Sequence, residues 1–238
     1  MDRSVNLDDT FLPIRPLPMP PDRDDVLRLG AFQERSSVAG PGERSVVWVA
    51  GCHRRCPGCI KPDLFDFGAG EEIPVLSIVD RLRTIRDVAG VTFSGGEPFE
   101  QPVALAAVAR AMHELNRDVL VYTGYRFEAL SADWNEVRQT LLREVDILVD
   151  GEYRQESGSA TNWRGSGNQR VLALSERGRD TLSRLQRPRQ EIASVQVSME
   201  SDGIRITGCP DRGFLDRLMP ELGARGIQAL PETRKVWP

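Results

Sequence analysis

Three of the four cysteines lie close together in one loop, as Cys52, Cys56 and Cys59. Their spacing, C-x3-C-x2-C, lets three thiolates bind three corners of a [4Fe–4S] cube and leaves one iron without a protein ligand. A structural zinc site would need a fourth ligand. The candidates for this fourth ligand are Cys209 and His53. His53 is adjacent to Cys52 in sequence, and adjacent residues rarely point into the same site. The pattern therefore favours an iron–sulfur cluster over zinc or a disulfide, with Cys209 as an inert buried thiol.

The sequence around this loop alternates between short apolar runs and helical segments. A buried strand is predicted at 45–50, directly before Cys52. Further strands are predicted at 90–94, 118–122 and 145–149, and helices at 76–88, 102–115 and 134–143. Repeated β-α units predict a parallel sheet with right-handed crossovers, either open or bent towards a barrel. Ligands of such sheets bind at the carboxyl ends of the strands, which is where the cysteine loop begins.

Two regions flank this α/β core, which we place at 26–175. Residues 1–25 are rich in proline and aspartate and have no apolar period, so we expect an irregular arm there. Residues 176–238 are expected to form an extension, with a hairpin from 193–199 and 204–207 and a helix at 214–222. The predicted fold is thus α/β, a partial (β/α) barrel with a small C-terminal β-β-α extension.

Composition and charge argue against several classes of protein. The net charge of −4 gives no basic surface for nucleic acid, and the arginines at 177–189 are explained by a solvated helix face or loop. No apolar stretch approaches the ~20 residues that cross a bilayer. The proline-interrupted N-terminus lacks the apolar run of a signal peptide. We therefore expect a cytoplasmic protein that binds neither nucleic acid nor a membrane.

The cysteine spacing resembles the signature of the radical S-adenosylmethionine superfamily. That superfamily carries a Gly-Gly-Glu motif, and this chain has Gly95-Gly96-Glu97-Pro98 after the strand predicted at 90–94. Alone, such a tripeptide is more typical of a plain turn, but its place in the strand order after the cysteine loop favours a cofactor role. Two glycines allow the backbone to approach the methionine end of S-adenosylmethionine, whose ammonium can be bound by carbonyl groups and by the Glu97 carboxylate.

Further motifs, at roughly 27–174, resemble those of the anaerobic ribonucleotide reductase activating proteins. They are Gly40-Pro41-Gly42-Glu43-Arg44, Tyr122-Thr123-Gly124-Tyr125, Val149-Asp150-Gly151 and Trp163-Arg164-Gly165-Ser166-Gly167-Asn168-Gln169-Arg170. The chain departs from these relatives in three ways. Gly58 replaces the aromatic residue usual in the wider superfamily before the last cysteine, Glu152 replaces a proline after Asp150-Gly151, and the chain continues beyond the core to residue 238.

The resemblance implies a set of site residues. Cys52, Cys56 and Cys59 are expected to bind a [4Fe–4S] cluster. The residues expected to bind S-adenosylmethionine are Gly95, Gly96, Glu97, Pro98, Thr123, Tyr125, Asp150, Arg164 and Asn168. A helix cap explains Thr123-Gly124-Tyr125 equally well, and a common turn explains Asp150-Gly151. Arg164 and Asn168 can bind a carboxylate or ribose of the cofactor, or only tie down a loop. No catalytic residue is assigned.

The family also implies a reaction. An external donor of the flavodoxin or ferredoxin type reduces the cluster, S-adenosylmethionine is cleaved, and the 5′-deoxyadenosyl radical abstracts hydrogen from a glycine of a partner such as an anaerobic ribonucleotide reductase. One alternative is a radical enzyme that acts directly on a small metabolite or peptide. Another is an iron–sulfur electron carrier or redox sensor, which would not need Gly95-Gly96-Glu97. The extension is expected to recognise the substrate or partner, or else to cover an exposed sheet edge.

Overall fold

The computed structural model describes residues 25–157, 163–184, 195–200, 203–208 and 213–226. The arm expected at 1–25 lies almost wholly outside the described residues, as does Cys209. None of the helices in the described part of the chain is long and apolar enough to cross a membrane.

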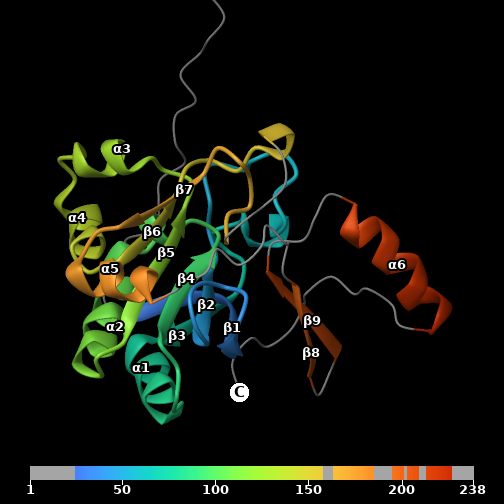
Figure 1. The fold of residues 1–238 in the computed structure, drawn as a ribbon, viewed down its shortest axis with the longest axis horizontal. Helices are drawn as coiled ribbons and strands as arrows, with labels where there is room; N and C mark the ends of the chain where they lie inside the picture. The colour runs from blue at the N-terminus through green and yellow to red at the C-terminus, as the bar shows by residue number, and fades with distance from the viewer. Residues whose placement is uncertain (1–24, 158–162, 185–194, 201–202, 209–212, 227–238) are drawn as a thin grey trace, which may run out of the picture.

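A mixed seven-stranded sheet carries the fold, in the order β3-β1-β2-β4-β5-β6-β7 (Figure 1). Its four central strands are parallel, as the β-α pattern predicts. They are β2 (Arg44–Val49), β4 (Gly90–Gly95), β5 (Asp118–Thr123) and β6 (Ile147–Asp150). The flanking strands run antiparallel to their neighbours and are β1 (Val26–Ser36), β3 (Glu71–Pro74) and β7 (Arg170–Ala173). The predicted α/β fold with a partial barrel is confirmed, and antiparallel strands complete the sheet on both sides.

One face of the sheet is covered by the helices of the β-α units. These are α1 (Val75–Thr84), α2 (Pro102–Glu114), the short α3 (Phe127–Ser131) and α4 (Glu136–Leu142). Val91 and Phe93 of β4 form one buried cluster with Ile78 of α1 and Leu105 of α2. Alternate residues of a strand point to one face, so this cluster fixes the register of the central strands. The helix predicted at 134–143 is present as α4, preceded by α3.

The other face is covered in part by α5 (Glu176–Ser183), so that of the two alternatives for the arginines at 177–189, a helix face or a loop, the helix holds as far as residue 183. Leu182 packs against Leu120, Ile147 and Val149, which come from β5 and β6. Most residues of α5 are polar, so its one apolar contact gives no clear helical period in the sequence.

The motif at 40–44 builds a buried ion pair on this second face. The Arg44 guanidinium is fully buried and pairs with Asp118, while its Nε donates to Thr92 Oγ1 at 2.7 Å. A Cβ atom at Gly40 would lie 2.8 Å from Arg44 Cδ. Asp118 also accepts from Thr181 of α5 at 3.0 Å. The motif therefore has a structural role here, because a buried pair needs hydrogen bonds to both partners.

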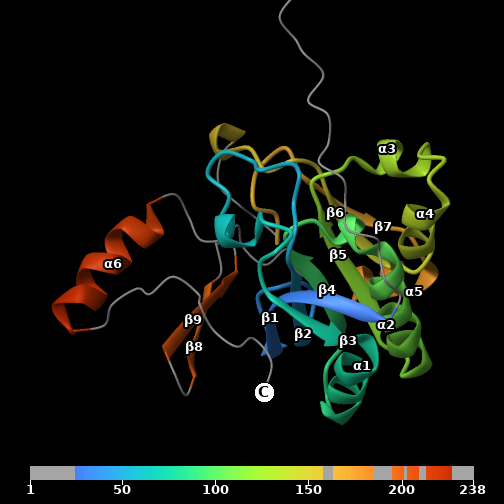
Figure 2. The same ribbon diagram turned by 180° about the vertical axis from the view of Figure 1, so that it is seen from behind.

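The C-terminal hairpin and helix are present as predicted. The elements are β8 (Val195–Glu200), β9 (Gly203–Gly208) and α6 (Phe214–Ala224). Thr207 Oγ1 donates to Gln33 Oε1 at 2.6 Å, and the Arg205 guanidinium lies 5.8 Å from the centre of the Trp48 ring. The hairpin thus contacts β1 and β2 through side chains, and α6 stands away from the sheet in Figure 1 and in the reverse view of Figure 2.

Candidate iron–sulfur and cofactor site

The cysteine loop leaves the carboxyl end of β2 through a glycine turn. Gly51 has φ of 93°, and a Cβ atom there would lie 2.6 Å from the Phe67 ring. The Cys52 N–H donates to the Phe65 carbonyl at 3.1 Å, just after η1 (Pro62–Leu64). Only glycine fits this turn without strain, so the turn fixes the direction in which the loop leaves the sheet.

All three cysteines of the loop carry free thiols. Cys52 is buried, and Cys56 and Cys59 are half-buried. Burial raises the pKa of each thiol, that of Cys52 to about 11. Backbone N–H groups donate to every one of these sulfur atoms: Arg55 and Arg54 to Cys52, Tyr153 to Cys56, and Lys61 to Cys59. Hydrogen bonds of this kind stabilise the thiolate form, which is the form that binds iron.

This donor set fits a cluster with three protein ligands better than a single metal ion. Within the described ranges, no three His, Cys, Asp or Glu side chains surround a common ion position. A [4Fe–4S] cube does not require its ligands to surround one common position, because each thiolate binds a different iron. His53, the alternative zinc ligand, has Nδ1 at 3.3 Å from Glu100 Oε1 and its ring 4.5 Å from that of Phe67.

The Gly-Gly-Glu motif lies directly against the start of the cysteine loop. The Gly96 N–H donates to the Val49 carbonyl at 2.6 Å, and the Glu97 N–H donates to the Gly51 carbonyl at 2.8 Å. A Cβ atom on Gly96 would lie 2.3 Å from that same Gly51 oxygen. Gly95 has φ of 102°, and a Cβ atom there would lie 2.5 Å from the Val49 carbonyl oxygen. Both glycines are therefore required for this close packing, which brings the carboxyl ends of β2 and β4 together.

The Glu97 carboxylate joins β4 to β5. It is 1% exposed and accepts from Thr123 Oγ1 at 2.8 Å, the Gly124 N–H at 2.9 Å and the Phe99 N–H at 3.1 Å. Burial raises its pKa to about 7, although these hydrogen bonds act in the opposite direction. A carboxylate has about four acceptor positions, and these three donors leave one of them unused. Pro98 follows as the first residue of η2 (Pro98–Glu100) and is buried.

Tyr125 follows β5 and contacts the cysteine loop. Its ring lies 4.2 Å from the Arg54 guanidinium, and its hydroxyl donates to Glu100 Oε1 at 3.2 Å. A Cβ atom on Gly124 would lie 2.2 Å from Arg54 Cδ, so glycine leaves room for this arginine. Burial, with the Glu100 carboxylate, raises the pKa of Tyr125. Sequence reasoning missed Arg54, because nothing in the cysteine spacing indicates which side chain crosses to the next strand.

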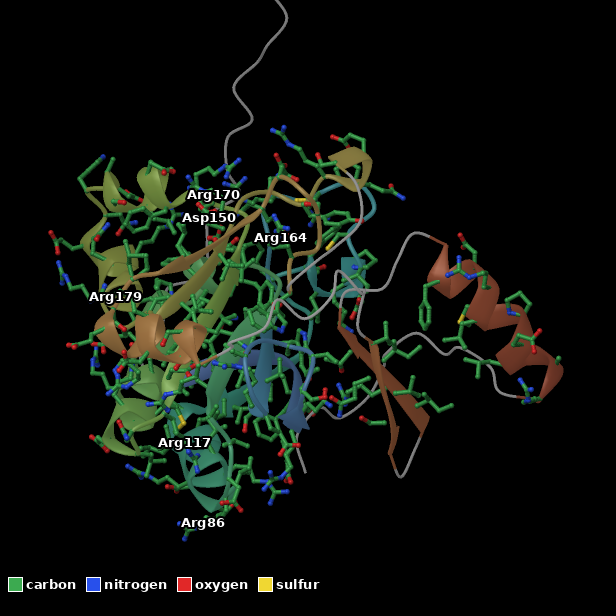
Figure 3. The ribbon with its side chains drawn as sticks, viewed as in Figure 1. Arg86, Arg117, Asp150, Arg164, Arg170 and Arg179 are labelled. Atoms are coloured by element: carbon green, nitrogen blue, oxygen red, sulfur yellow. The ribbon has the colours of Figure 1, made fainter. Side chains whose placement is uncertain are left out.

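Asp150 ends β6 and is fully buried. Its carboxylate accepts from the Phe127 N–H at 2.8 Å and from Arg170 Nε at 2.9 Å. Figure 3 shows Asp150, Arg170 and Arg164 at one end of the sheet and Arg117 at the opposite end. The structure thus gives Asp150 a structural role at the carboxyl end, and its contact with a cofactor stays a prediction.

The segment at 163–170 ties down the loop that follows β6. Asn168 Nδ2 donates to the Glu152 carbonyl and Gln169 Nε2 to the Gly151 carbonyl, each at 2.8 Å. Arg164 Nη1 donates to the Gln169 carbonyl at 3.3 Å. These bonds match the loop-anchoring alternative for Arg164 and Asn168, and their direct contact with the cofactor stays a prediction. Gln169 lies within the motif that the sequence analysis singled out, but its anchoring role needed the fold.

The three cysteines lie in one loop at the carboxyl edge of a partial α/β barrel. This arrangement is typical of domains that bind a single iron–sulfur cluster. A family model described as "4Fe-4S single cluster domain" matches residues 38–172. The chain therefore belongs to that family, and is a radical S-adenosylmethionine enzyme of the activating type.

Relatives with known names agree with this assignment. The anaerobic ribonucleoside-triphosphate reductase-activating protein of Salmonella typhi is 34% identical over 146 residues, which are 58% of this chain and 92% of that protein. The protein of the same name from Escherichia coli (strain K12) is 31% identical over 148 residues, with the same coverage of each chain. The pyruvate formate-lyase-activating enzyme of Clostridium pasteurianum is 34% identical over 138 residues, which are 55% of each chain.

Proposed function

We propose that this enzyme binds a [4Fe–4S] cluster through Cys52, Cys56 and Cys59, binds S-adenosylmethionine beside it, and generates a glycyl radical on a partner enzyme. The hydrogen bond from the Glu97 N–H to the Gly51 carbonyl, 2.8 Å long, carries this proposal. It attaches the Gly-Gly-Glu turn to the residue that precedes Cys52. An electron carrier or redox sensor would need the thiols but would not need the Gly-Gly-Glu turn beside them.

Each group in this arrangement has a task that its contacts support. When bound, the cluster and S-adenosylmethionine supply, after one-electron reduction, a 5′-deoxyadenosyl radical that abstracts hydrogen. Glu97 offers its remaining acceptor position to the ammonium group of the cofactor. Thr123 and Gly124 hold the Glu97 carboxylate in place through their hydrogen bonds. Gly96, without a Cβ atom, allows the backbone to pack closely against Gly51, beside the start of the cysteine loop.

The partner is inferred from the relatives. The matched region covers 92% of the ribonucleotide reductase-activating protein of Salmonella typhi but only 55% of the pyruvate formate-lyase-activating enzyme of Clostridium pasteurianum. This difference favours a glycyl radical enzyme of the anaerobic ribonucleotide reductase type as the partner. A flavodoxin or ferredoxin would supply the electron.

Electron paramagnetic resonance tests the proposal. The reconstituted chain is reduced with dithionite under anaerobic conditions and incubated with S-adenosylmethionine and an anaerobic ribonucleotide reductase from the same organism. We expect a glycyl radical doublet on the reductase, and none with the Cys56→Ser variant. Cofactor cleavage that leaves every glycyl radical enzyme of the organism unchanged would contradict the activase function and favour a small substrate.

A further inference from the structure

The loop after β6 lies against the cysteine loop. The Cys56 thiol donates to Glu152 Oε1 at 3.8 Å, and the Tyr153 N–H donates to the Cys56 sulfur. Gln155, three residues after Glu152, fills the space beside Gly58. A Cβ atom on Gly58 would lie 2.5 Å from Gln155 Oε1. Glu152 therefore places a carboxylate next to one of the three expected cluster ligands.

The backbone of Glu152 is held in this position from its other side. Asn168 Nδ2 donates to the Glu152 carbonyl, and Gln169 Nε2 donates to the preceding carbonyl of Gly151. The Asn168 amide is itself fixed by Ser166 Oγ, which donates to Asn168 Oδ1 at 2.8 Å. Rotation of the half-buried side chain can move the carboxylate, but the anchored backbone keeps it beside the cysteine loop.

We propose that Glu152 is a positioning residue that keeps one negative charge beside the Cys56 sulfur and thereby lowers the reduction potential of the cluster. This inference rests on the proposed function. Once Cys56 binds iron as a thiolate, its proton is gone and the carboxylate faces a negative sulfur. Reduction adds one electron from an external one-electron donor without making or breaking a bond. Adding that electron near a negative charge held close by is unfavourable, and cluster potentials respond to nearby charge.

Glu152 is one of the positions at which this chain departs from the family pattern. In the motif that this segment resembles, a proline follows the Asp-Gly pair, and proline carries no charge. A carboxylate at this position makes the reduced cluster a stronger reductant. It also requires an electron donor of lower potential.

A redox titration of the reconstituted holoenzyme, followed by electron paramagnetic resonance, tests this role. Wild type is compared with Glu152→Gln, which removes the charge, and with Glu152→Asp, which keeps the charge but shortens the side chain. Glu114→Gln is the matched control, because Glu114 is exposed at the end of α2, away from the carboxyl edge, and pairs with Arg83. Iron content is measured for each protein.

We expect a higher midpoint potential in Glu152→Gln, a smaller rise in Glu152→Asp, and no change in Glu114→Gln. Equal potentials in wild type and both Glu152 variants, at full iron content, would contradict this inference and leave the proposed function intact. Loss of iron in both Glu152 variants would also contradict it, because Glu152 would then serve cluster assembly. A wild-type chain that binds no cluster would instead contradict the proposed function.

Discussion

Glu97 shows how much of the site depends on one buried carboxylate. Its three hydrogen-bond donors come from the turn after β4 and from the residues that end β5. The Gly-Gly-Glu pattern predicted Glu97 as a site residue, and the structure places this carboxylate between the turn after β4 and the end of β5. Its donors Gly124 and Phe99 were not predicted, because backbone N–H groups become neighbours only when the two strands pair.

The raised pKa of Glu97 predicts a pH dependence of cofactor binding. A pKa of about 7 means that the carboxyl group is mostly protonated at lower pH. A cationic ammonium binds the ionised form, so affinity for S-adenosylmethionine should rise roughly tenfold between about pH 5.5 and about pH 7, below the range where the α-amino group titrates. Equilibrium dialysis measures this rise.

The isosteric variant Glu97→Gln provides the comparison. It should bind the cofactor more weakly by about 1.5–3 kcal/mol, the worth of a charge-assisted hydrogen bond, and show no such pH dependence. Its iron content should equal that of wild type. A variant with wild-type affinity at every pH would remove Glu97 from the cofactor site.

The three loop cysteines should each be indispensable for iron. Anaerobic reconstitution is expected to give about four iron and four sulfide per wild-type chain. Single Cys→Ser substitutions at 52, 56 and 59 should abolish this uptake, whereas Cys209→Ser should leave it unchanged. Iron and sulfide assays measure the result, and a colourless wild-type protein with one bound zinc would overturn the ligand assignment.

Gly96 should be intolerant of any side chain. A Cβ atom 2.3 Å from the Gly51 carbonyl oxygen forces backbone to move, so Gly96→Ala should destabilise the protein by about 1–3 kcal/mol. Gly223→Ala is the control, because a Cβ atom there meets nothing within 4 Å and alanine favours the helix. Thermal unfolding should show a lower midpoint for Gly96→Ala alone. Equal midpoints would mean that this close packing is absent in solution.

At the scale of elements, the parallel strands of the seven-stranded sheet and the C-terminal hairpin were predictable, whereas the edge strands β3 and β7 were not. β4, β5 and β6 are continuous apolar runs between helices, which is the pattern of buried parallel strands. β3 has the sequence Glu-Glu-Ile-Pro, and only one of its residues is buried, so its pairing with β1 left little apolar signal. The helix alternative for α5 could not be separated from the loop for the same reason.

The packing of α5 changes where the C-terminal extension should be cut. Although we expected the core to end at 175, Leu182 and Thr181 of α5 contact the sheet and Asp118. Truncation after Arg184 should therefore give a soluble chain that keeps its iron and its cleavage of S-adenosylmethionine. It should lose radical transfer to the partner if the hairpin and α6 recognise that partner. Iron assay and electron paramagnetic resonance measure the two properties.

Truncation after Leu174 is the comparison for this cut. It also removes α5 and exposes Leu120, Ile147 and Val149, so we expect poor solubility. If the longer protein, ending at Arg184, also aggregates or loses iron, the hairpin and α6 are part of the fold, and partner recognition loses its support. Their side-chain contacts with Gln33 and Trp48 would then be the structural reason.

At the scale of the whole molecule, the carboxyl edge of the sheet brings together segments that are distant in sequence. The cysteine loop, the Gly-Gly-Glu turn, the end of β5 and the loop after β6 are joined there by Glu97, Arg54 and Glu152. The order of strands was enough to predict that these segments meet at this edge. The contacts across it required the structure, because Arg54 and Glu152 belong to no recognisable spacing.

Cleavage of S-adenosylmethionine by the full chain is the measurement that tests this account most directly. The protein is reconstituted with iron and sulfide, reduced with dithionite without oxygen, and mixed with S-adenosylmethionine, and the products are separated by chromatography. We predict that 5′-deoxyadenosine and methionine form in equal amounts, and that Cys56→Ser forms neither. A fully loaded, reduced wild-type protein that leaves S-adenosylmethionine intact would contradict the account.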